Sequence, residues 1–206
     1  MPYTALRVTD KGIVLFTQHA RRLESAGPGA LLALRQLAAT GKPGVYAIWA
    51  DDGGTLRIEA RGGSRLHDGM PVRWQPSPLA MSSGAQAKAA SPNLYDAVRE
   101  PGIATLLTSS DGMQIHESCS AAVLGWDGDR LVCVPADTPR IWSTAETAVR
   151  ENMPTRNVPL PVDDPSMPLV LVNAVKGVCT IDVPGRAPFP KAVVQQLEAL
   201  FARLTE

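Results

Sequence analysis

Hydrophobic and polar residues alternate in short runs along this chain, and each run is bounded by a turn. The clearest case is Asp51-Asp52-Gly53-Gly54, which lies between alternating runs at residues 45–50 and 55–61. Alternation with a period of two on both sides of a glycine-containing turn is typical of a β-hairpin. The pattern predicts hairpins over residues 4–16, 45–61 and 123–134.

Other runs have the spacing of helices. Residues 30–39 carry apolar side chains at i, i+3 and i+4 and end before Thr40-Gly41-Lys42-Pro43. Further helices are expected near Thr17, from Ser143 or Thr144 to Glu151, and over residues 191–204, and a buried strand is expected over 169–173. Helices and hairpins mixed in this order predict an α+β fold.

The segment from Pro71 to Pro92 differs from its surroundings because it is rich in Pro, Ser, Ala and Gly. Such a composition does not favour a long helix or a central strand. We expect this stretch to join two lobes: residues 1–78 form a smaller α+β lobe, 79–92 an interdomain segment and 93–206 a larger α+β lobe.

Composition narrows the functional classes. The 206 residues are 45% hydrophobic and 19% charged, which suits a globular protein, and 20 basic residues balance 20 acidic ones. Without a basic block, nucleic acid is not expected as a partner. The sequence also gives no reason to expect a metal, a membrane segment or a signal peptide. Three cysteines without CxxC spacing favour a reducing cytoplasm: Cys119, Cys133 and Cys179.

One pair of residues suggests specific chemistry. Glu117 follows a glycine turn and a strand, and Lys88 is an isolated lysine among small residues upstream. Pyridoxal phosphate chemistry needs a lysine that holds the aldehyde as a Schiff base and a carboxylate that keeps the pyridine nitrogen protonated. Each residue also has an ordinary interpretation, since Lys88 could be solvated and Glu117 could face water at a strand end.

Four regions, in order, resemble the class IV aminotransferase family, which includes branched-chain and D-amino acid aminotransferases and 4-amino-4-deoxychorismate lyase. They are His19-Ala20-Arg21-Arg22-Leu23, Lys88 with Tyr95 after it, Gly112 to Leu124, and the pair Arg140 to Ala145 and Val172 to Val178. The resemblance implies a two-lobed fold-type IV architecture, with pyridoxal 5'-phosphate at the junction of the lobes. It also implies a homodimer.

The resemblance also implies roles for individual residues. Arg22 corresponds to the arginine that binds the cofactor phosphate, Lys88 to the Schiff-base lysine, and Glu117 to the acid at the ring nitrogen. Helix-entry residues Ser143, Thr144 and Ala145 would bind the phosphate, and Asn173 and Ala174 would line the phosphate and the substrate carboxylate. The expected function is that of a pyridoxal phosphate enzyme acting on an amino-bearing substrate, with the Asn173 segment favouring the lyase branch slightly over transamination.

The sequence departs from the family at three positions, with Ala122 in place of Asn, Ser143 in place of Gly and Ala145 in place of Thr. These departures support a second hypothesis, a non-catalytic relative that serves as a binding or dimerisation module. A third is an α+β protein with a chance likeness. Alternatives also stay open for single residues: Arg22 could be a surface arginine, and Ser143 and Thr144 could be a helix N-cap pair.

Overall fold

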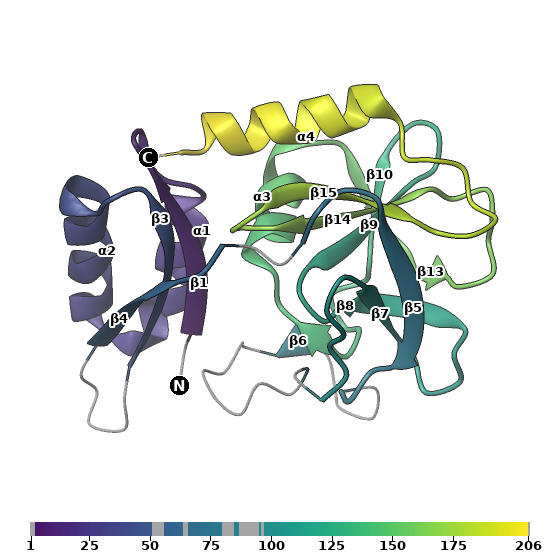
Figure 1. Ribbon diagram of the computed structural model, residues 1–206, viewed down its shortest axis with the longest axis horizontal. Helices are drawn as coiled ribbons and strands as arrows, with labels where there is room; N and C mark the ends of the chain where they lie inside the picture. The colour runs from purple at the N-terminus through teal and green to yellow at the C-terminus, as the bar shows by residue number, and fades with distance from the viewer. Residues whose placement is uncertain are drawn as a thin grey trace.

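Two lobes of unequal size make up the computed structural model, which describes residues 3–50, 56–63, 66–79, 85–86, 95 and 97–205. The smaller lobe, purple to blue in Figure 1, lies beside the larger one, teal to yellow. Strands of the described residues form a four-stranded sheet, a nine-stranded sheet and a two-stranded pair.

The smaller lobe is an antiparallel sheet of order β2-β1-β3-β4 with two helices packed against it. Every second residue of β1 is buried, including Leu6 and Val8, and these meet Leu34 and Leu37 of α2 in one core. This period-two burial is what the sequence pattern predicts. The elements are β1 (Tyr3–Thr9), β2 (Gly12–Ile13), α1 (Phe16–Leu23), a 3-10 turn (Glu24–Ala26), α2 (Pro28–Thr40), β3 (Gly44–Ala50) and β4 (Leu56–Arg61).

The larger lobe contains the nine-stranded sheet, of order β12-β10-β9-β14-β15-β5-β7-β8-β13. Its two edge strands, β12 and β13, are separated in the chain by only Val158 and Pro159, so the two ends of the sheet must approach each other and the sheet curls. Its strands are β5 (Met70–Pro76), β7 (Ala104–Thr108), β8 (Gln114–Ser118), β9 (Ala122–Trp126), β10 (Leu131–Cys133), β12 (Thr155–Asn157), β13 (Leu160–Pro161), β14 (Leu169–Asn173) and β15 (Gly177–Asp182).

Alternation along β9 and β14 divides the larger core in two. Leu124 and Val170 face a core shared with α3 (Thr144–Asn152) and α4 (Lys191–Arg203), while Val123 and Leu171 face the core inside the curl. Both helices match their predicted ranges to within a residue or two. No helix in the described ranges is long and apolar enough to cross a membrane.

The junction of the lobes is held by the end of α4. Val14 and Leu15, which follow β2 in the smaller lobe, belong to the core that contains α3 and α4. The Leu15 N–H donates to the Leu204 carbonyl at 2.8 Å, and Val14 forms a β-bridge with Thr205. The C-terminus therefore ends against the smaller lobe, although α4 lies on the larger one (Figure 1).

One expectation is wrong. Strand β5 begins at Met70 and pairs in parallel with both β15 and β7, so it is a central strand inside the segment for which the composition disfavoured one. Its prolines, Pro71 and Pro76, stand near the two ends of the strand, where a missing N–H interrupts the ladder least. Residues 70–76, which the predicted boundary puts in the smaller lobe, are thus part of the larger sheet.

Candidate functional site

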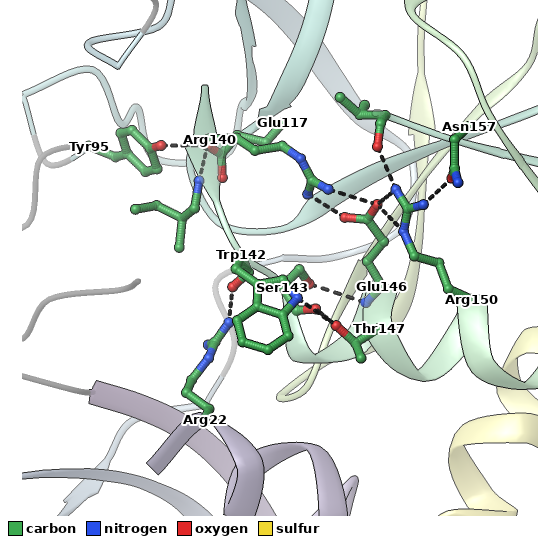
Figure 2. A network of polar contacts seen from close by, with 12 residues as sticks. Arg22, Tyr95, Glu117, Arg140, Trp142, Ser143, Glu146, Thr147, Arg150 and Asn157 are labelled. Atoms are coloured by element: carbon green, nitrogen blue, oxygen red, sulfur yellow. Dashed lines mark hydrogen bonds and ion pairs between the residues drawn. The ribbon is translucent and has the colours of Figure 1, made fainter. Parts of the chain in front are cut away.

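Glu117 is buried in the larger lobe near the end of β8. It is 5% exposed, and its Oε1 accepts hydrogen bonds from the Tyr95 hydroxyl at 2.5 Å and the Ile141 N–H at 2.7 Å. Figure 2 shows the Tyr95 hydroxyl directed at this acid. Among the described residues no hydrogen bond reaches Oε2. The alternative of a glutamate facing bulk water is therefore excluded, and one oxygen of the carboxylate is held by two donors.

The surroundings of Glu117 set its acidity. Burial raises the pKa of Glu117 to about 7, against the opposing effect of the hydrogen bonds from Tyr95 and Ile141 and of the positive charge of Arg140. Burial and the neighbouring acid raise the pKa of Tyr95, so its phenol keeps its proton and remains a donor. Near neutral pH this carboxyl can therefore gain or lose a proton.

The turn after the acid is held by two side chains. Ser118 Oγ accepts from the N–H groups of Ser120 at 3.2 Å and Ala121 at 2.9 Å, and Asn173 Nδ2 donates to the Ser120 carbonyl at 3.0 Å. Ala122 starts β9 and is 4% exposed. The turn is therefore supported although Ala122 stands where the family has asparagine.

Asn173 and Ala174 lie at the end of β14, where the chain turns back into β15. Asn173 Oδ1 accepts from the N–H groups of Val175 at 3.0 Å and Lys176 at 2.7 Å, which fixes the turn. Ala174 is buried in the core shared with α3 and α4. The amide of Asn173 thus connects two turns of the larger lobe.

Arg22 reaches from α1 of the smaller lobe to the entry of α3 in the larger lobe. Its guanidinium donates to the Trp142 carbonyl (Figure 2), and burial lowers its pKa to about 10, so it stays cationic at neutral pH. Arg22 therefore makes a contact between the two lobes. A small hollow beside it is lined by Gln18, Arg21, Arg22, Trp142, Thr144 and Thr147.

The entry of α3 combines a side-chain cap with free backbone amides. Ser143 is the N-cap, because its Oγ accepts from the Glu146 N–H at 3.2 Å. Thr144 and Ala145 occupy the first turn, where α-helix geometry leaves the N–H groups without a carbonyl partner. Such amides, together with the helix dipole, suit an anion, and Arg22 adds a full positive charge beside them.

Lys88 lies outside the described residues. The nearest described residue before it is Gln86, the last residue of β6 (Ala85–Gln86), which pairs in parallel with β11 (Arg140–Ile141). Gln86 is the register partner of Ile141, whose N–H binds Glu117. The chain thus approaches Lys88 from a point beside the acid.

A charged cluster next to these groups was not predicted. Arg140 and Glu146 are 3% and 2% exposed and form a bidentate ion pair, which Arg150 joins from the next turn of α3 (Figure 2). The i, i+4 spacing of Glu146 and Arg150 was the available signal. It is weak, because most such pairs lie on solvated helix faces.

Solved structures of similar shape include aminotransferases and a lyase. A hypothetical aminotransferase from Mycobacterium tuberculosis in its PLP-bound form is 16% identical, with 99% of this chain and 88% of that one covered and a TM-score of 0.64. A putative branched-chain amino acid aminotransferase from Thermotoga maritima is 13% identical, with 98% of this chain and 85% of that one covered and a TM-score of 0.71. The 4-amino-4-deoxychorismate lyase from Pseudomonas aeruginosa is 14% identical, with 98% of this chain and 90% of that one covered and a TM-score of 0.62.

The molecule therefore has a two-lobed α+β fold that aminotransferases and a lyase share. It is a fold-type IV architecture, as in the fold IV-transaminase from Curtobacterium pusillum, and this confirms the predicted fold class. At 13–16% identity, what is shared is the fold. No family model matches the chain, and no curated protein matches it by sequence.

Proposed function

We propose that this protein is a pyridoxal 5'-phosphate-dependent enzyme acting on an amino acid or another amino-bearing substrate, as an aminotransferase or a lyase. The observation that carries the proposal is Glu117, a buried acid with one oxygen fixed by two donors, in a fold shared with such enzymes. When bound, pyridoxal phosphate supplies a ring that accepts electrons from a substrate carbon.

Glu117 would hold a proton at the ring nitrogen through Oε2. The opposite oxygen is occupied by Tyr95 and Ile141, so the carboxylate cannot rotate without breaking two hydrogen bonds. A buried, oriented acid of raised pKa suits a shared proton better than a solvated one.

Lys88 would hold the cofactor aldehyde and later move the α-proton of the substrate through Nζ. Gln86, two residues before Lys88 in the sequence, is the register partner of Ile141, whose N–H binds Glu117. This pairing supports a lysine and an acid that serve one ring.

The phosphate would lie at the junction of the lobes. Arg22 supplies charge, and the N–H groups of Thr144 and Ala145 supply donors at the start of α3. Asn173, beside the turn that follows the acid, would face the substrate carboxylate. The departures at Ser143 and Ala145 leave these backbone donors in place, so they do not favour a non-catalytic relative.

We further propose a homodimer in the cytoplasm. The unpaired edge strand β4, which is exposed along most of its length, supports an interface with a second subunit. The three cysteines are free and buried, as in a reducing compartment. Both aminotransferases and a lyase share the fold, so the reaction outcome depends on substrate-side groups.

The absorption spectrum of the purified protein with pyridoxal phosphate tests the function. We expect a band distinct from that of free cofactor, which shifts when an amino acid is added, and which Lys88→Ala abolishes. Lys191→Ala, at an exposed position at the start of α4, is the matched control and keeps the band. A wild-type spectrum identical to that of free cofactor would contradict the proposal.

A further inference from the structure

The Arg140–Glu146–Arg150 cluster is a costly arrangement for a purely structural role. Arg140 Nη2 donates to Glu146 Oε1 at 3.0 Å and Nη1 to Oε2, while Arg150 Nε and Nη2 donate to Oε1 at 2.9 and 2.5 Å. Among the described residues Arg140 Nε has no partner, although it is buried. Buried ion pairs are often no more stabilising than apolar side chains of similar volume.

The cluster is joined to the acid through the two-residue strand β11. Arg140 supplies a guanidinium to Glu146, and the next residue, Ile141, donates its N–H to Glu117 Oε1 at 2.7 Å. Any shift of the ion pair along β11 therefore moves a hydrogen bond of Glu117. Figure 2 shows Arg140, Glu117 and Glu146 near Ser143, the N-cap of α3.

The charges of the cluster do not cancel. Two arginines face one glutamate, which leaves one positive charge in a buried region, and Glu117 is the acid next to it. Among the described residues, the other titratable groups near the acid are Tyr95, which donates to it, and His116, whose ring lies against the Pro139 carbonyl. Arg99 also lies nearby and donates to the Cys119 carbonyl, two residues after the acid. Burial lowers the pKa of His116.

We propose that Arg140 is a positioning residue that favours the ionised form of Glu117 and helps to orient it toward the ring nitrogen, and that Glu146, bound to both Arg140 and Arg150, holds Arg140 in place. The proposal rests on the proposed function. It also goes beyond it, because it assigns the control of the acid to a charge excess held between β11 and α3. The positive charge of Arg140 stabilises the carboxylate and the negative charge of Glu146 opposes it, in agreement with the direction of both effects on the pKa of Glu117.

The test is to measure the pKa of Glu117 in the cofactor-free protein by an NMR titration of ¹³C-labelled glutamate carboxyls. The Glu117 signal is the one that disappears in the Glu117→Gln variant. We expect Arg140→Gln to raise this pKa by about one unit and Glu146→Gln to lower it by a similar amount. Opposite signs are diagnostic, because general loosening of the region would move the pKa in the same direction in both variants.

A milder variant covers the case in which Arg140→Gln does not fold. Arg150 is 22% exposed on its side chain, and Arg150→Gln leaves the Arg140–Glu146 pair intact. We expect it to raise the pKa of Glu117 by less than Arg140→Gln does. Arg186→Gln is the matched control: its guanidinium also binds carbonyls in the fold, at Met167, Pro161 and Val162, and it should leave the pKa unchanged.

The proposal is overturned if the pKa stays unchanged in folded Arg140→Gln or Arg150→Gln, or if Glu146→Gln raises it. Because the measurement uses no cofactor, it is independent of the spectrum that tests the proposed function. A changed pKa in a protein that does not bind pyridoxal phosphate would support the electrostatic coupling and reject the enzymatic role.

Discussion

The two ends of the candidate site are built in different ways. At the acid end, Glu117, Tyr95 and Ile141 all come from the larger lobe and fix one carboxylate with side-chain and backbone donors. At the phosphate end, Arg22 comes from the smaller lobe and meets the backbone amides of α3. The acid end depends on residue identity, while the phosphate end depends mainly on the helix and on the contact between lobes.

The largest effect is expected from Glu117→Gln at the acid end. The amide oxygen can still accept from Tyr95 and Ile141, but the amide nitrogen cannot take a proton from a ring nitrogen. We expect turnover to fall by roughly 10²- to 10⁴-fold while the absorption band remains, because Lys88 is unchanged. Glu198→Gln, exposed on α4, is the control. Unaltered turnover would remove the acid end from the mechanism.

The second prediction concerns pH and the stability of the cofactor-free protein. The pKa of Glu117 rises from 4.5 to about 7 on folding, so the folded state binds more protons than the unfolded state between these values. Stability therefore falls as the pH rises from about 4.5 to about 7, by on the order of 3 kcal/mol, and is not regained above that range.

Urea unfolding of wild type and Glu117→Gln at both ends of this range isolates the effect. Carboxyls with lowered pKa, such as Asp68 and Asp111, act in the opposite direction but are present in both proteins. The difference between the two proteins should thus report Glu117 alone. If the free energy of unfolding depends on pH equally in both proteins, burial does not raise the pKa of Glu117.

The third prediction tests the phosphate end. Arg22→Gln removes the charge that the smaller lobe brings to α3, and the affinity for pyridoxal phosphate should fall by roughly 10- to 100-fold, as for a lost charge-assisted hydrogen bond. Arg22→Lys should restore part of it, since charge is kept without the planar fork. Arg35→Gln, exposed on α2, is the control. Equal affinity in all four proteins would place the phosphate elsewhere.

The sequence was informative where one residue type is required. Glu117 could be found from its turn and strand, and the hairpins and helices follow from periods of two and 3.6 residues. Strand β5 was missed because prolines at its ends hid the short run between them. The cluster around Glu146 was missed because its burial arises from β10, β11 and α3 packing together, which no local pattern reveals.

The turn after Glu117 shows the same limit in another form. Ala122 looked like a loss, since the family has asparagine there, yet this turn is held by Ser118, three residues from its partner Ala121, and by Asn173, 53 positions from its partner Ser120. Sequence comparison by position cannot detect such a replacement, because the new partner lies on another strand.

The smallest effects are expected at the start of α3, where variants of Ser143 distinguish capping of the helix from binding of the phosphate by its amides. Ser143→Ala removes the acceptor for the Glu146 N–H and should cost about 1 kcal/mol of stability, while the amides of Thr144 and Ala145 still bind the phosphate. Ser143→Asp caps the helix equally well, so stability is kept, but its carboxylate repels the phosphate and cofactor affinity falls. Thermal unfolding and cofactor titration of the two variants give opposite patterns if the phosphate lies at this helix entry. If Ser143→Asp binds the cofactor as tightly as wild type, the phosphate does not lie there, and the contrast between the two ends of the site must be redrawn.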